Sequence, residues 1–147
     1  MTLTEARTLA LMHMHKHGLI IEGWTFKFDN AKSRLGLCSH RRRIISVSKH
    51  YVTLNDQPLI EDTILHEIAH ALCGHEAGHN WEWKATAKKI GSRGVRQKSA
   101  NEVNSVKGKY AMICEKCGEI GRRHRWTRTF NVRHYTHRGC GGRVTIQ

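Results

Sequence analysis

The stretch ILHEIAHALCGHEAGHNWEW, residues 64–83, places four histidines within fourteen positions and a glutamate directly after the first of them. On an α-helix, positions i and i+4 lie on the same face, so His66 and His70 can bind one metal ion. Glu67 follows the first of these ligands and can take a proton from a water molecule that the metal activates. The pattern HExxH therefore predicts a zinc-dependent hydrolase with Glu67 as its general base.

A catalytic zinc usually has three protein ligands and one open position, so a third ligand must be found. His75 follows His70 so closely that the chain would need an immediate tight reversal to use it. His79 follows a loop with two glycines, and this favours His79 as the third ligand. Cys38 is the alternative, because peptide deformylases pair an upstream cysteine with HExxH. That alternative predicts a hydrolase of formylated peptides or other small amides.

The remaining pattern predicts a mixed fold with a small, mostly antiparallel sheet. Trp24, Phe26 and Phe28 alternate with polar residues, which is typical of a half-buried strand. The histidines of the first helix, His13, His15 and His17, are expected near a solvated helix end. The predicted helices are 3–17, 58–73 and 80–90, and the predicted strands are 24–28, 34–39 and 43–48.

Two short motifs near the C-terminus predict a second metal site. CEKC at residues 114–117 and HRGC at residues 137–140 each bring two metal-binding side chains together, with nineteen residues between them. His134 is a competing ligand, but its spacing to the last cysteine fits such a motif poorly. The predicted ligands of a structural zinc ion are Cys114, Cys117, His137 and Cys140.

The charge of the chain favours a polyanionic partner. Its formal net charge is +13, from 25 Lys and Arg against 12 Asp and Glu, and seven arginines but no acidic residue follow Glu119. Aromatic residues are interleaved with these arginines, a combination suited to single-stranded or distorted DNA. The alternative is that the aromatic rings form a small core of their own. The predicted DNA-binding residues are Arg122, Arg123, Arg125, Trp126, Arg128 and Arg133.

The N-terminal sequence lacks the pattern of a signal peptide or a membrane span. We therefore expect a cytoplasmic protein associated with the nucleoid, or a nuclear protein if it is eukaryotic, and no membrane partner. Five cysteines in a reducing compartment indicate metal binding more than disulfide bonds. A monomer is expected.

Four segments together resemble the SprT family of zinc metalloproteases, whose eukaryotic relatives include Spartan. They are WTFKFDNAKSRLGLCS from residue 24, RIISVS from residue 43, IEDTILHEIAHAL from residue 60 and GHNWEWK from residue 78. With the cysteine motifs, the resemblance covers about residues 20–145. It implies an α+β, zincin-like metalloprotease domain at 1–92 and a zinc ribbon that binds nucleic acid at 110–147, and the polar, basic composition of residues 93–109 predicts a linker between them.

In that family the third zinc ligand is the histidine of a Gly-His segment that shortly precedes an aromatic residue. This maps the catalytic zinc to His66, His70 and His79, with Glu67 as the general base. Family members often have glycine directly after the third ligand, where this chain has Asn80.

The resemblance also implies a substrate class: proteins bound or crosslinked to DNA, cleaved with DNA as scaffold and activator in a DNA-repair role. Shared binding to DNA would raise the local concentration of substrate. The alternative is a zinc-stabilised nucleic-acid-binding or transcription-associated protein without protease activity.

Overall fold

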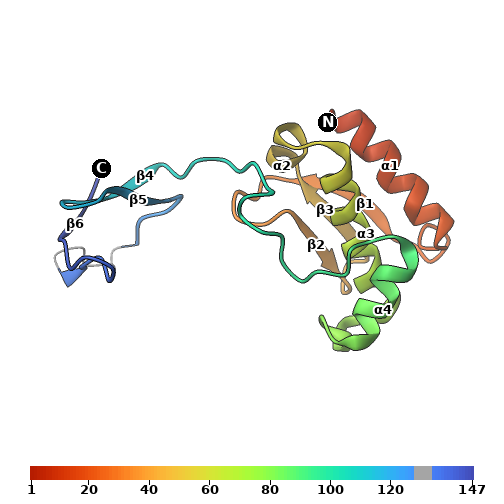
Figure 1. The fold of residues 1–147 in the computed structure, drawn as a ribbon. Coiled ribbons are helices and arrows are strands. Elements are labelled where there is room, and N and C mark those ends of the chain that lie inside the picture. The colour runs from red at the N-terminus through yellow and green to blue at the C-terminus, as the bar shows by residue number, and fades with distance from the viewer. Residues whose placement is uncertain (128–133) are drawn as a thin grey trace. The chain divides into compact units, whose positions relative to one another are not determined.

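The computed structural model describes residues 1–127 and 134–147, which form two compact units, Met1–Ser105 and Val106–Gln147. Helices and two small sheets are present, in agreement with the predicted α+β class (Figure 1). No helix in the described ranges is long and apolar enough to cross a membrane. The boundary between the units falls inside the segment 93–109 that the sequence predicts as a linker.

Local sequence signals set the ends of the helices in the first unit. The Thr2 side chain accepts a hydrogen bond from the backbone N–H of Glu5, and the Glu5 side chain accepts one from the Thr2 backbone, which is a capping box. Gly18 turns the chain after this helix with a φ of 75°. The helices are α1 (Leu3–Lys16), α2 (Lys49–Leu54), α3 (Gln57–Cys73), the short 3-10 helix η1 (His75–Ala77) and α4 (Trp81–Ile90). Three of them match predicted helices, whereas α2 has no counterpart among the predicted elements.

The sheet of the first unit is mixed, which corrects the prediction of a mostly antiparallel sheet. Its strands β1 (Thr25–Asp29), β2 (Gly36–Ser39) and β3 (Ile44–Ser48) lie in the order β1-β3-β2. β2 pairs antiparallel with β3, but β1 pairs parallel with β3. Because Ile45, Ser46 and Val47 are all buried, β3 is covered on both faces and suits the central position. This arrangement leaves β2 at an edge.

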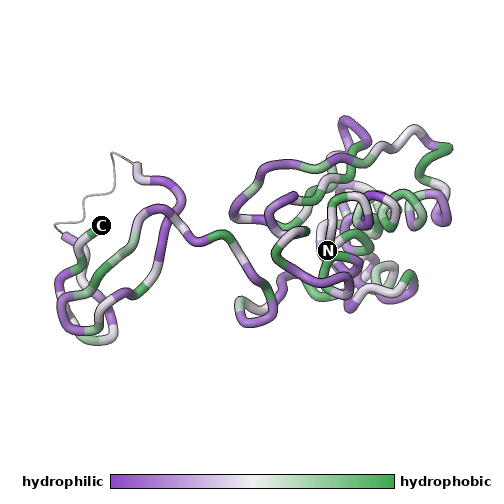
Figure 2. The backbone as a smooth tube through the Cα atoms, turned by 90° about the horizontal axis from the view of Figure 1, so that it is seen from above, coloured by the Kyte–Doolittle hydropathy of each residue, from purple (hydrophilic) through white to green (hydrophobic). Residues whose placement is uncertain are grey.

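The core of the first unit lies between its helices and its sheet. α3 packs against α1, β2 and β3, and α1 also packs against β1 (Figure 1). The predicted alternation holds in β1, where Phe26 is buried and Lys27 is exposed. Hydrophobic residues recur along the helices of this unit (Figure 2). Fully buried side chains include Met14, Ile45, Val52, Ile60, Ile64 and Ile68.

His13 departs from the expected solvated position of the N-terminal histidines. It is only 9% exposed, and its Nε2 atom lies 2.8 Å from Oε1 of Glu61 on α3. Its neighbour His15 is exposed, as expected. The partly buried contact between His13 and Glu61 therefore ties α1 to α3.

Residues 92–104, which we call the strap, pack against α3 although their polar composition reads as a linker. The Asp62 carboxylate accepts hydrogen bonds from the Ser92 hydroxyl and the Arg93 backbone N–H, both at 2.8 Å. It also pairs with the Lys98 ammonium at 2.6 Å. Burial raises the pKa of Asp62, but the hydrogen bonds from Lys98, Arg93 and Ser92 outweigh it and hold the pKa at about 2. The strap is thus latched to α3 by a single carboxylate.

The second unit is a small antiparallel sheet. Its strands β4 (Tyr110–Cys114), β5 (Gly118–Arg123) and β6 (Val144–Ile146) lie in the order β5-β4-β6. Among its described residues, the buried hydrophobic side chains are Ala111, Cys114 and Val144. Such a core is too small to stabilise a unit of this size by itself.

Candidate metal centre

A tight reversal after α3 carries the chain from the first two predicted ligands to the third. Gly74 and Gly78 flank η1 with φ angles of 88° and 53°, values that favour glycine. His79 comes next, and the Asn80 side chain then caps α4 by accepting hydrogen bonds from two backbone N–H groups. The third histidine is therefore held between a glycine turn and a capped helix.

The three predicted ligands direct their Nε2 atoms towards one another, and these three atoms form what we call the histidine triangle. The Nε2 atom of His66 lies 3.3 Å from that of His70, and the Nε2 atom of His79 lies 3.1 Å from each of them. In tetrahedral zinc sites the Zn–N bonds of about 2.0–2.1 Å place two ligand nitrogens about 3.3 Å apart. The triangle therefore fits a zinc ion with three imidazole ligands.

Trp83 on α4 supports all three rings. Its ring centroid lies 4.6 Å from that of His66, 5.2 Å from that of His70 and 4.7 Å from that of His79. Its indole Nε1–H donates to the His66 backbone carbonyl at 3.4 Å. Trp83 is fully buried, so it fixes the ring orientations from behind. In the sequence Trp83 appears only as part of the motif GHNWEWK, and its contact with all three histidines is not predictable from that motif.

The ring nitrogens are poised to bind a metal at neutral pH. Burial, followed by the influence of the neighbouring histidines, lowers the pKa of His66 to about 3 and that of His70 to about 4. Burial also lowers the pKa of His79. The rings are thus neutral at pH 7, and a neutral imidazole offers the lone pair that zinc requires.

Glu67 lies beside this triangle in a confined, poorly hydrated position. It is 7% exposed, and burial raises the pKa of its carboxyl to about 7, against the opposing effect of Lys98 and Arg34. Gly36 on β2 makes room for it, because a Cβ atom at position 36 would lie 2.9 Å from Glu67 Oε1. A carboxyl with a pKa near neutrality suits a general base. No local sequence pattern marks Gly36 for this role, because the contact joins residues distant in the chain.

The alternative ligands lie elsewhere. Cys38 is not part of the histidine group, and its thiol lies 3.8 Å from the His40 Nε2 atom. Burial and the nearby Glu67 raise the pKa of the Cys38 thiol to about 12. The His75 ring instead faces that of His40, with centroids 5.7 Å apart. These positions favour His79 as the third ligand.

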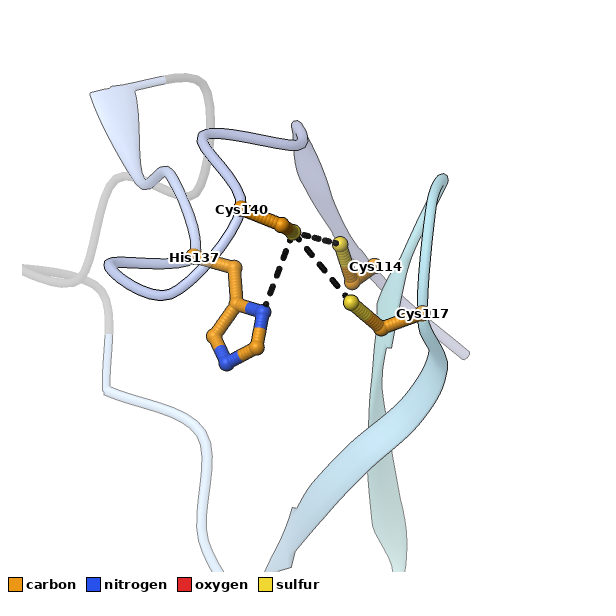
Figure 3. Close-up of side chains that lie close together, drawn as sticks. All are labelled: Cys114, Cys117, His137 and Cys140. Carbon is orange, nitrogen blue, oxygen red and sulfur yellow. Dashed lines mark hydrogen bonds between the residues drawn. The ribbon is translucent and has the colours of Figure 1, made fainter.

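The second unit brings the four predicted structural ligands together. The Cys140 Sγ atom lies 3.5 Å from Cys114 Sγ, 3.2 Å from Cys117 Sγ and 3.3 Å from His137 Nδ1 (Figure 3). Cys114 and Cys117 flank the turn between β4 and β5, and the other two ligands share one loop. Their ligand atoms all lie within 4.8 Å of one another, which is compatible with one tetrahedral zinc. His134 is not part of the group.

A glycine also makes room for this cluster. A Cβ atom added at Gly142 would lie 2.5 Å from Cys114 Sγ and 3.4 Å from Cys140 Sγ. The close approach of the Gly142 backbone to the sulfur atoms is therefore open only to glycine. No local sequence pattern marks Gly142 for this contact, because Cys114 lies far from it in the chain.

The predicted DNA-binding arginines of β5 and the residues after it are exposed. The Nε and Nη2 atoms of Arg122 donate to the two carboxylate oxygens of Glu119, at 2.8 and 3.0 Å. Arg123 and Arg125 are exposed as well. The ion pair with Glu119 offsets the charge of Arg122.

The remaining predicted DNA-binding residues are only partly described. The Trp126 side chain is 36% exposed, and its ring centroid lies 6.4 Å from that of Tyr110 on β4. Both alternatives for this ring therefore stay open, stacking on a base or packing within the unit. Arg128 and Arg133 lie outside the described residues.

A family model described as the SprT-like family matches residues 5–105. The chain belongs to the SprT-like family. The matched region coincides closely with the first unit and contains Glu67 and the three histidines, which supports a metallopeptidase-like domain there. The second unit lies beyond the SprT-like match. Comparison with curated proteins and with solved structures found no significant match.

Proposed function

We propose that the protein is a zinc-dependent endopeptidase that cleaves proteins bound or crosslinked to DNA. The observation that carries this proposal is the triangle of Nε2 atoms from His66, His70 and His79 with the buried carboxyl of Glu67 beside it. Membership of the SprT-like family supports the same chemistry.

Each group of the centre has a definite part in this proposal. Bound zinc supplies a Lewis acid that polarises a carbonyl and lowers the pKa of water. His66, His70 and His79 hold the ion with neutral rings, and Trp83 keeps those rings in place. Glu67 takes the proton of the attacking water and returns it to the leaving amine, as general base and then general acid. Its pKa of about 7 allows both transfers near neutral pH.

DNA enters the proposal through the net charge of +13 and the exposed arginines of the second unit. Arginine side chains neutralise phosphates and release counterions, which gives affinity without sequence preference. A protease with little preference for its cleavage site would then meet its substrate through high local concentration on a shared strand. The Cys3His cluster, filled with zinc, would hold the arginine-bearing strand in place.

The decisive experiment measures cleavage of a DNA-binding protein with and without single-stranded DNA, with and without a chelator. We expect DNA to stimulate cleavage, and the chelator to stop it. Glu67→Gln should lower kcat by at least about 100-fold while zinc content stays unchanged, because the amide keeps the shape but takes no proton.

Full proteolysis by Glu67→Gln would overturn the proposed mechanism, and a rate independent of DNA would overturn the proposed substrate class. Binding of DNA without cleavage by the wild-type protein would instead favour the alternative of a nucleic-acid-binding protein. Glu76→Gln, a change on η1 outside the histidine triangle, serves as the matched control and should retain the wild-type rate.

A further inference from the structure

A cleft of about 420 Å³ opens beside Glu67 in the first unit. Its floor is formed by Thr63, His66 and Glu67 of α3. One wall is formed by residues 33–36, which lead into the edge strand β2, and the other by strap residues between 97 and 100. Because a metal ligand and the general base both line this cleft, a bound substrate chain has to pass it.

Each wall of the cleft contributes a cation. Lys98 comes from the strap, and only 7% of its side chain is exposed. Its ammonium pairs with Asp62, but that carboxylate also binds Arg93, with the Arg93 Nε atom 3.5 Å from Asp62 Oδ2. Arg93 is also paired with Glu102, with its Nη1 atom 2.8 Å from Glu102 Oε1, so two cations share two anions here. Lys98 keeps N–H donors beyond the one that pairs with Asp62, because an ammonium carries three.

Arg34 lies on the opposite wall. Its Nη2 atom donates to Asp29 Oδ2 at 3.1 Å, and 48% of its side chain is exposed. A guanidinium carries further N–H donors, so this ion pair leaves Arg34 able to bind a second anion.

The charges of the lining favour an anionic ligand. Among the lining residues, Arg34 and Lys98 each contribute a positive charge and Glu67 at most one negative charge. The lining therefore has a net charge of +1 or more. A carboxylate bound in the cleft would lie near both cations that line it, and charge-assisted hydrogen bonds are strong in a partly dehydrated site.

We propose that this cleft binds an acidic side chain, Asp or Glu, of the protein substrate at a fixed position near the cleaved peptide bond, with Arg34 and Lys98 as specificity-determining residues. The inference rests on the proposed protease function. A protein side chain fits better than a DNA phosphate, because a nucleic-acid strand in the cleft would cover Glu67 and block the substrate chain.

The test digests a peptide library in the presence of single-stranded DNA and identifies the cleavage positions by mass spectrometry. We expect Asp and Glu to be enriched about tenfold at one position relative to the cleaved bond. Arg34→Gln and Lys98→Met should reduce this enrichment several-fold. Arg34→Glu should shift the preference at the same position towards Lys and Arg, a change that a purely structural role would not produce.

Arg93→Gln is the matched control, because Arg93 also pairs with Asp62 but does not line the cleft. This variant should keep the acidic preference. Cleavage without an acidic preference, or a preference unchanged in Arg34→Glu, would overturn the inference while leaving the protease function standing. Weaker DNA binding by Arg34→Glu with an unchanged preference would assign the cleft to a phosphate and overturn it as well. Absence of any cleavage by the wild-type protein would overturn the proposed function together with the inference.

Discussion

The two candidate metal-binding clusters of this protein are built in opposite ways. The histidine triangle stands on α3 and at the start of α4, and buried side chains such as Ile64, Ile68 and Trp83 support it. The Cys3His cluster stands on turns, in a unit whose described residues bury only Ala111, Cys114 and Val144 as hydrophobic side chains. In the first unit the fold holds the site, whereas in the second unit a metal ion would hold the fold.

Removal of metal should produce the largest difference in stability between the two units. Zinc binding to small structural sites is worth about 10 kcal/mol or more, so a chelator should unfold the second unit. The first unit should keep its helices, because its core does not include the metal. Hydrogen exchange of the full chain measures this: amides of β4 and β6 should lose protection, and those of α3 should retain it. Equal loss in both units would contradict the comparison.

Two substitutions sharpen the same comparison. His79→Ala and Cys117→Ser should each lower the zinc content from about two ions per chain to about one. Only Cys117→Ser should also abolish amide protection in the second unit. A loss of amide protection in α3 of His79→Ala would show that the fold of the first unit, too, depends on its metal.

The glycines beside the two clusters give a smaller effect of the same kind. Gly142→Ala would press a Cβ atom on Cys114 Sγ and should release zinc from the second unit. Gly36→Ala would displace the Glu67 carboxylate and should lower kcat by about 100-fold with zinc retained, because small displacements of a catalytic group are costly. Gly139→Ala is the control, since its Cβ atom would lie 3.7 Å from the nearest atom, in His137. Zinc analysis and single-turnover kinetics distinguish the three variants.

The contacts of Asp62 with the strap, which we call the Asp62 latch, should have the smallest effect. Their contribution to the stability of the first unit depends on pH. The pKa of Asp62 is about 2 in the folded protein, below its ordinary value of 3.8. The latch therefore stabilises the first unit fully above about pH 4, and this contribution is lost as the pH falls from about 4 to about 2. Asp62→Asn should lower the free energy of unfolding by about 2 kcal/mol at pH 6, with the difference vanishing near pH 2. Urea titrations of metal-free protein measure it.

The double variant Asp62→Asn/Lys98→Met controls for the ammonium that the single change leaves buried without its carboxylate. Its free energy of unfolding at pH 6 should be closer to the wild-type value than that of the single variant is. A pH-independent difference between Asp62→Asn and the wild type would contradict the latch.

Features set by neighbouring residues were predictable from the sequence. Pro58 and Gly74 mark the ends of α3, and Asn80 and Gly91 mark those of α4, because caps act within one helical turn. The ligand spacing within α3 follows from the helical period alone.

Features set by distant partners were not predictable in this way. The parallel pairing of β1 with β3 depends on which strand is buried on both faces. The strap looks like a linker until Asp62, thirty residues before Ser92, supplies its anchor. The burial of His13 likewise depends on Glu61, forty-eight residues away. The positions of Gly36 and Lys98 beside the candidate site were not predictable for the same reason.

The contact of Trp83 with all three histidines has one more consequence. An indole ring emits light, and its emission responds to the charge and distance of the groups that touch it. Trp83 contacts all three histidines, so replacing the other three tryptophans, Trp24, Trp81 and Trp126, with phenylalanine would isolate its signal. Metal entry, ligand protonation and substrate arrival could then be followed in real time by fluorescence, without any added label.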